Sequence, residues 1–108
     1  MSGYMLISSR DPFECGDTES FYRLATDLKA KGRDVTLFLV QNGVLPARVG
    51  ADNAALRKAI GAGVRVLADD FSLRERALDK GVLADGIKAA PLESVVDALA
   101  AGAKALWH

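Results

Sequence analysis

The sequence predicts a three-layer α/β/α sandwich with a mainly parallel sheet of about five strands. Strand-like and helix-like segments alternate along the whole chain, and each helix closes near a glycine. Segment 34–40 is apolar on both faces, which is typical of a strand covered by helices on each side. The length of 108 residues favours one domain, spanning 1–108.

The first strand is expected at 4–7 and the first helix at 18–31. Four apolar residues recur at helical spacing in this helix and should pack on the sheet: Phe21, Leu24, Ala25 and Leu28. Asp17 is the expected N-cap, and Gly32 ends the helix because glycine tolerates the left-handed conformation there.

The apolar second strand at 34–40 is expected to lie centrally in the sheet. The segment that follows, 41–46, is interpreted as a tight turn leading into a loop. Asn42-Gly43 accommodates positive φ, and Pro46 has no backbone donor. A short helix should then run over about 53–62, capped by Asp52.

The third strand is expected at 64–68. Segment 72–75, Ser-Leu-Arg-Glu, matches a capping box that would start a helix ending near Gly81. A fourth strand is expected within 84–88.

The last helix is predicted to start at Pro91, since proline suits the first helical position. Its expected core stripe is Leu92, Val95, Val96 and Leu99. A final strand at 104–107 follows Gly102, with Trp107 as an apolar anchor or an oligomer contact. If that strand is parallel, His108 reaches the same sheet edge as Cys15, where the two could form a thiolate–imidazole pair.

Composition narrows the classes of partner. The 14 basic and 14 acidic side chains cancel, which argues against binding to nucleic acid or to an anionic membrane. No apolar run approaches the length of a membrane span, and the N-terminus lacks signal-peptide features. The single cysteine cannot form an internal disulfide. We therefore expect a soluble, cytoplasmic protein with a small-molecule or protein partner, and predict no cofactor and no metal ligands.

The candidate reactive residue is Cys15, which lies in the loop between the first strand and the first helix. In open parallel sheets such loops form the ligand crevice, and the following helix N-terminus favours a thiolate. Ser8, Ser9, Arg10 and Asp11 occupy the same loop as candidate ligand-binding residues. The simpler alternative is that Ser9 or Asp11 caps a turn and Arg10 pairs with a neighbouring carboxylate. The loop lacks the glycine fingerprint of nucleotide binding.

Two other strand-end loops should converge on this crevice. Asn42 could donate to a ligand, although Asn42-Gly43 is also explained by turn geometry alone. Asp69 is the further candidate ligand-binding residue. The pair Asp69-Asp70 could hold a metal or share a proton, but adjacent aspartates before a helix more often act on the helix end.

Five segments carry a resemblance over nearly the whole chain: Met-Leu-Ile-Ser-Ser at 5–9, Phe-Tyr-Arg-Leu-Ala at 21–25, the strand and turn at 35–44, Gly-Val-Arg-Val at 63–66 and Lys-Ala-Leu-Trp at 104–107. In their order and spacing these segments resemble the DsrE/DsrF/DsrH family of small sulfur-relay proteins, which includes TusB, TusC and TusD. The resemblance implies a three-layer α/β domain, assembly into homo-trimers or hexamers, and transfer of sulfane sulfur as a cysteine persulfide in the cytoplasm.

One departure from the family pattern separates the functional hypotheses. In sulfur-carrying members the reactive cysteine lies just beyond the third strand, where this chain has Ala-Asp-Asp-Phe at 68–71. The leading hypothesis is sulfur relay with Cys15 as the acceptor, exchanging sulfur with a donor or acceptor protein. The alternatives are a non-catalytic interaction subunit and a sensor of a small anionic metabolite held near Arg10.

Overall fold

The computed structural model describes residues 3–79, 81 and 83–108 and shows an α/β fold with a five-stranded, all-parallel sheet. The strand order is β4-β3-β2-β1-β5, so the second strand is central, as predicted, with β3 and β1 on either side of it. The elements in chain order are β1 Tyr4–Ser8, α1 Asp17–Ala30, β2 Val35–Leu39, η1 Gln41–Ala47, α2 Ala54–Gly61, β3 Arg65–Asp69, α3 Asp70–Glu75, β4 Ile87–Ala90, α4 Glu93–Ala100 and β5 Lys104–Trp107.

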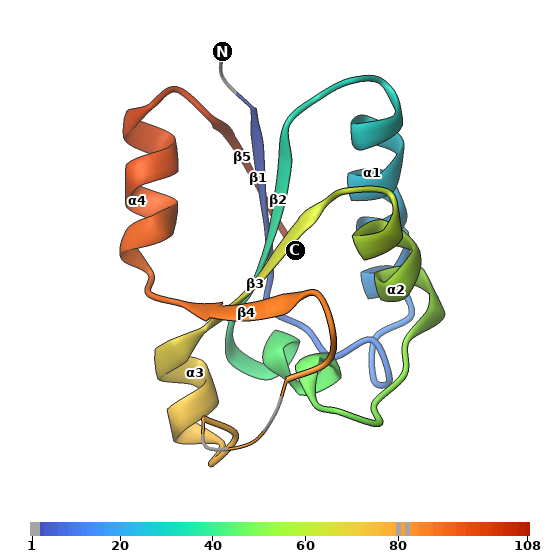
Figure 1. Cartoon of the computed structure of the whole chain (residues 1–108), viewed down its shortest axis with the longest axis vertical. Coiled ribbons are helices and arrows are strands. Elements are labelled where there is room, and N and C mark those ends of the chain that lie inside the picture. Colours follow the sequence, from blue (N-terminus) through green and yellow to red (C-terminus); the bar gives the residue numbers. More distant parts are fainter. Residues whose placement is uncertain (1–2, 80, 82) are drawn as a thin grey trace.

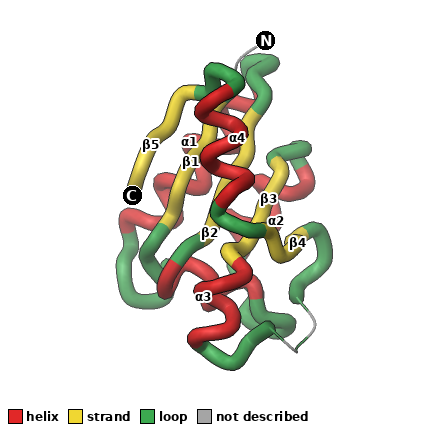
Figure 2. The backbone as a smooth tube through the Cα atoms, turned by 90° about the vertical axis from the view of Figure 1, so that its left-hand side faces the viewer, coloured by secondary structure: helices red, strands yellow, loops and turns green. Residues whose placement is uncertain are grey.

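Helices cover both faces of the sheet. Figure 1 shows α1 and α2 on one side and α4, with α3 below it, on the other. The view turned by 90° agrees, with α4 in front of the strands and α1 and α2 behind them (Figure 2). The predicted three-layer fold is therefore confirmed. None of the described helices is long and apolar enough to cross a membrane.

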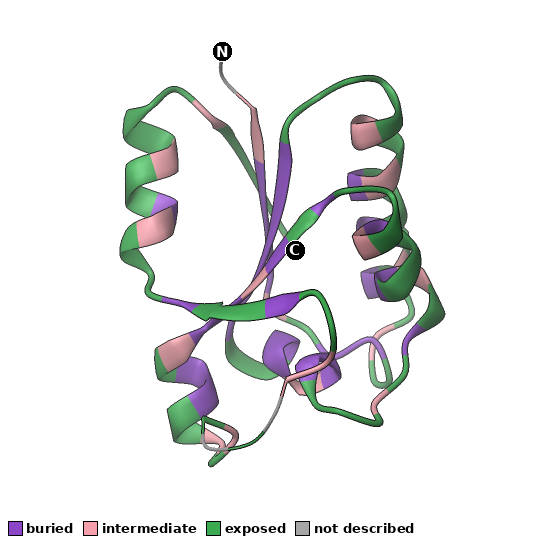
Figure 3. Ribbon diagram, in the orientation of Figure 1, coloured by how far each residue is buried: buried purple, intermediate pink, exposed green. Residues whose placement is uncertain are grey.

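The strands alternate their side chains between two apolar clusters. Leu6, Leu37 and Leu39 belong to the larger cluster, which includes residues of α1 and α2. Met5 and Phe38 belong to the smaller one, which includes a residue of α4. All five residues of β2 are buried, as expected for a strand covered on both faces (Figure 3).

Several predicted helix caps are wrong by one to three residues. The N-cap of α1 is Gly16 rather than Asp17, without a side-chain hydrogen bond. The cap of α2 is Asn53, whose side chain accepts from the amide of Leu56 at 3.0 Å, whereas the predicted cap Asp52 has φ +41°. The predicted capping box beginning at Ser72 is also wrong, because Asp69 caps α3.

Other boundaries also differ from prediction. Helix α3 ends at Glu75 and does not reach Gly81, and β4 begins at Ile87. The segment predicted as a tight turn is the 3₁₀ helix η1. Positive φ falls on Gln41 (+52°), whereas Gly43 is not among the residues with positive φ.

The predicted core stripe of the last helix is wrong. Of its four residues only Val95 is buried, while Leu92, Val96 and Leu99 are 57%, 60% and 44% exposed. Strand β5 lies where it was predicted, but Trp107 is 67% exposed and therefore not anchored by burial within the chain. Both α4 and β5 thus carry large apolar side chains that are exposed on the surface of the chain.

Candidate functional site

The loop between β1 and α1 is organised by Asp11. Its side chain accepts a hydrogen bond from the amide of Phe13 at 3.1 Å, and its carbonyl accepts from the amides of Glu14 (3.1 Å) and Cys15 (3.0 Å). Asp11 is buried, and such an aspartate-centred turn fixes a loop without secondary structure. The interpretation of Asp11 as a turn cap is confirmed, and the turn places Cys15 directly before the first turn of α1.

The Cys15 thiol is half-buried and lines a pocket of about 190 Å³ at the carboxyl edge of the sheet. The Thr18 hydroxyl and the backbone N–H of Asp17 lower the pKa of this thiol below its usual value. The positive charge of Arg10 lowers the pKa further, while partial burial opposes these effects. The alternative that Arg10 pairs with a neighbouring carboxylate is not seen among the described residues, where Arg10 forms no ion pair with Asp11 or Glu14.

His108 reaches this edge because β5 pairs with β1 in parallel. Its amide donates to the carbonyl of Ile7 (2.9 Å), and its own carbonyl accepts from the amide (2.9 Å) and hydroxyl (3.0 Å) of Ser9. The imidazole stacks on Phe21, with ring centroids 5.3 Å apart and planes 25° apart. The predicted meeting of His108 and Cys15 at one edge is confirmed.

The Asp17 carboxylate lies close to both Cys15 and His108. The ligand-type atoms of Cys15, Asp17 and His108 all lie within 4.8 Å of one another. They come from a loop, from the first residue of α1 and from the residue after β5. The edge therefore brings together a thiol and a carboxylate from one short stretch and an imidazole from the far end of the chain.

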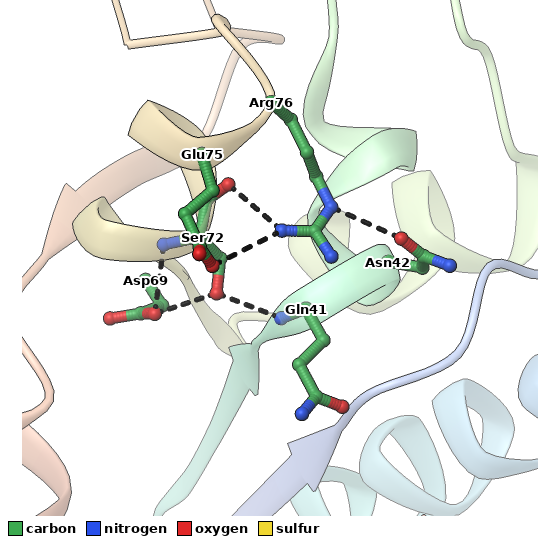
Figure 4. A network of polar contacts seen from close by, with 6 residues as sticks. All are labelled: Gln41, Asn42, Asp69, Ser72, Glu75 and Arg76. Atoms are coloured by element: carbon green, nitrogen blue, oxygen red, sulfur yellow. Dashed lines mark hydrogen bonds and ion pairs between the residues drawn. The ribbon is translucent and has the colours of Figure 1, made fainter.

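Asn42 and Asp69 belong to one polar network (Figure 4). The Asp69 carboxylate accepts from the amide (3.0 Å) and hydroxyl (2.7 Å) of Ser72, and the Ser72 hydroxyl accepts from the amide of Gln41 at 2.8 Å. The side chain of Asn42 accepts from Nε of Arg76 at 3.1 Å. This network ties the start of η1 to α3, so the loops after β2 and β3 hold each other in place.

Gly43 is required by close packing. A Cβ at this position would collide with the backbone carbonyl of Ser8, and the Gly43 amide donates to the carbonyl of Val40 at 2.8 Å. A residue without a side chain thus lets η1 pack against the end of β1.

The predicted ligand-binding residues separate into three groups. Ser9, Arg10, Asp11 and Asn42 line the Cys15 pocket together with Glu14. Ser8 is fully buried, and Gly43 is buried against it. Asp69 lines a different pocket, of about 310 Å³, whose apolar lining includes Phe71, Leu92 and Trp107.

Sequence reasoning missed two neighbours of the thiol, Asp17 and Thr18. Asp17 was interpreted as a helix cap and as a negative charge beside Cys15 that disfavours the thiolate, and Thr18 received no role. The signal that could have found both is their position: the first amide and side chains of a helix surround a group that directly precedes it.

Two solved structures share this fold over their full length. The ychN protein from E. coli has a TM-score of 0.89 at 19% identity, and the alignment covers 100% of both chains. MTH1491 from Methanobacterium thermoautotrophicum, a protein of unknown function, has a TM-score of 0.81 at 18% identity with the same coverage. No protein-family model and no curated protein sequence matches the chain. At these identities the likeness establishes the fold alone.

Proposed function

We propose that this chain is a DsrE-like protein of sulfur metabolism that accepts sulfane sulfur on Cys15 and passes it on. The observation that carries the proposal is the placement of an accessible thiol among donors at the carboxyl edge of the sheet. The Asp17 amide, the Thr18 hydroxyl and the Arg10 guanidinium all surround the sulfur. These groups stabilise negative charge on a thiolate and on the persulfide that it would become.

The chemical step needs no external oxidant. The Cys15 thiolate attacks the outer sulfur of a donor persulfide, R–S–SH, and forms a new S–S bond. The donor's S–S bond breaks, and R–S⁻ leaves with the electron pair, so Cys15–S–SH keeps the proton of the transferred sulfur. Attack by an acceptor thiolate on that outer sulfur then returns Cys15 to the thiolate.

The pocket beside Cys15 fits a small polar donor or the tip of a partner's persulfide-bearing loop. Its lining is polar, and Arg10 and Asn42 are exposed within it. Arg10 would attract an anionic donor, and the Asn42 amide would hydrogen-bond to it. The partners proposed are a sulfur-donor protein and a sulfur-acceptor protein in the cytoplasm.

We further propose that the chain acts as a homo-oligomer, a trimer or a hexamer. The support is the outward-facing apolar surface of α4 and β5, where Val96 and Trp107 are the most exposed large apolar side chains. Strand β5 is also an edge of the sheet, and all four of its residues are exposed. Edges and apolar patches of this kind are commonly covered by another chain.

A second candidate function is a non-catalytic interaction subunit, and one observation favours it. The end of β3, where sulfur-carrying members of the resembled family place their cysteine, is occupied here by the helix cap Asp69. The adjacent apolar pocket, with Phe71 and Leu92 exposed, would then serve only for assembly.

The test is intact-mass spectrometry after incubation of chelator-treated protein with a low-molecular-weight persulfide. The relay function predicts one additional sulfur atom on the wild-type chain, mapped to Cys15, and its transfer to an added thiol acceptor. Cys15→Ser is the control and should gain none. If the wild-type chain takes up no sulfur and forms a stable complex with another protein, the interaction-subunit function is correct instead.

A further inference from the structure

We propose that Cys15, Asp17 and His108 form a binding site for a thiophilic divalent metal ion, with Zn²⁺ as the best-fitting cation. The three side chains supply one sulfur, one carboxylate oxygen and one imidazole nitrogen, all within 4.8 Å of one another. These are the three ligand types of zinc sites in proteins. Cys15 and Asp17 are two residues apart at the start of α1, and the fold brings His108 to them from the other end of the chain.

The spacing of the ligand atoms is close to that of a tetrahedral site. Zinc–ligand bonds of about 2.0–2.3 Å place neighbouring ligand atoms about 3.3–3.6 Å apart. Side-chain rotations that bring the atoms about 1 Å closer would therefore complete the geometry. Asp17 is exposed, and in the part of the chain that the structure describes no cation pairs with its carboxylate, so this side chain is free to turn toward the sulfur.

The imidazole is already held in position. The backbone of His108 is fixed on both sides by Ile7 and Ser9, and its ring is stacked on Phe21. Its Nδ1 is buried and has no hydrogen-bond partner among the described residues. Buried ring nitrogens are normally paired, and a bound cation would provide such a partner.

A second, independent feature points at the same place. Thr18 is fully buried beside Cys15, and its hydroxyl has no partner within the geometric limits of a hydrogen bond among residues 3–79, 81 and 83–108. A metal-bound thiolate accepts hydrogen bonds from such neighbouring groups, which hold the ligand in orientation. The Thr18 hydroxyl is therefore placed to support the sulfur ligand.

The donor set selects the class of cation. Mg²⁺ and Ca²⁺ prefer oxygen ligands throughout, whereas a thiolate with an imidazole favours Zn²⁺ and similar transition metals. Three protein ligands leave a fourth position of a tetrahedral ion for water or another small ligand. The pocket lined by Ser9, Arg10 and Asn42 adjoins Cys15 and offers access to that position.

This inference goes beyond the proposed sulfur transfer and does not require it. A thiolate binds Zn²⁺ whether or not it carries sulfur, and the ion would occupy the electron pair that attacks a persulfide. Bound Zn²⁺ should therefore block persulfide formation. The two ideas fail separately, because sulfur uptake is measured with a chelator present and metal binding is measured without any sulfur donor.

The experiment starts from metal-free, reduced, full-length protein. Equilibrium dialysis against Zn²⁺ with elemental analysis should give one ion per chain, and Cys15→Ser, Asp17→Asn and His108→Gln should each weaken binding at least tenfold. Asp27→Asn is the matched control, because it makes the same change at an exposed residue of the same helix and should bind like wild type.

Co²⁺ provides a measurement that needs no variant. Wild-type protein loaded with Co²⁺ should show a thiolate-to-cobalt charge-transfer band together with the visible bands of a tetrahedral ion. Absence of both features overturns the inference, as does Zn²⁺ binding that is equal in wild type and in His108→Gln. If the His108 variant fails to fold, the wild-type cobalt spectrum alone decides.

Discussion

Replacement of Ser72 with alanine is expected to weaken the fold by removing two hydrogen bonds at once. The buried Ser72 hydroxyl donates to the Asp69 carboxylate at 2.7 Å and accepts from the Gln41 amide at 2.8 Å. This hydroxyl links Asp69, the cap of α3, to Gln41 at the start of η1 (Figure 4). Alanine would leave the Gln41 amide without its partner and the carboxylate with only the Ser72 amide.

The size of the effect follows from the two bonds. A hydrogen bond to a charged group contributes about 1.5–3 kcal/mol and a neutral one about 0.5–1.5 kcal/mol, so the free energy of unfolding should fall by about 2–4 kcal/mol. With a shift of about 4 °C per kcal/mol for a domain of this size, Tm should fall by about 8–16 °C. The loss is a large part of the stability of an ordinary domain.

The assay is urea unfolding followed by circular dichroism, with Ser20→Ala as the control. Ser20 is an exposed serine near the start of α1 that makes no side-chain cap hydrogen bond to the described residues, and its replacement should change the free energy of unfolding by less than about 0.5 kcal/mol. If Ser72→Ala is as mild as the control, the network does not join the loops after β2 and β3, and this reasoning is refuted.

Four further predictions concern packing and the thiol. Gly43→Ala should destabilise the protein in the same urea assay because its Cβ meets backbone, and wild-type stability would contradict this. Val95→Ala should cost about 1–3 kcal/mol and the adjacent Val96→Ala less than about 0.5 kcal/mol, because only the first is buried; equal losses would be inconsistent with the placement of α4. In chelator, the pH profile of Cys15 alkylation should have its midpoint below that of the unfolded chain, since the folded pKa is lowered and the thiolate is lost only at lower pH. Thr18→Val should move that midpoint up and slow alkylation at neutral pH, and an unmoved midpoint would show that the hydroxyl does not act on the sulfur.

The layers and strands could be predicted because apolar runs report burial directly. The apolar segment 34–40 contains β2, and the final strand was placed at 104–107 without error. The order β4-β3-β2-β1-β5 could not be predicted, since it depends on contacts between strands that no local pattern encodes.

Helix α4 shows why periodicity overstates the core. Leu92, Val95, Val96 and Leu99 recur at helical spacing on one stripe, but the helix turns toward the sheet the side that carries Val95 and Ala98, and the rest of the stripe stays exposed. Only Val95, with Ala98 packed nearby, reaches the sheet. The spacing of apolar residues therefore predicted the helix correctly and its buried face incorrectly.

The helix-capping residues were predicted wrongly for a different reason. Asp52 and Asn53 are both good capping residues one position apart, and Asp69 and Ser72 are both good capping residues three positions apart. The choice between them depends on backbone conformation, which the residue types do not determine. The observed helix boundaries therefore differ from the predicted ones, although the helices themselves lie where they were predicted.

The sequence predicted the loop that carries the candidate site, but it did not predict all of the residues that form the site. The position of Cys15 after the first strand placed it at the correct edge, and the parallel last strand brought His108 there. The role of Asp17 beside these two residues depends on the turn made by Asp11 and on the packing of Phe21 against the imidazole. Both are contacts between side chains and backbone that appear only in three dimensions.

The central claim is that the fold activates Cys15 toward sulfane sulfur. It is tested most directly by the rate constant for persulfide formation in the native, chelator-treated protein, compared with a peptide of residues 9–20 and the same donor at neutral pH. The account predicts that the native protein reacts several-fold faster, because Thr18 and Arg10 surround the sulfur only in the folded chain. A native rate equal to or below that of the peptide would contradict it.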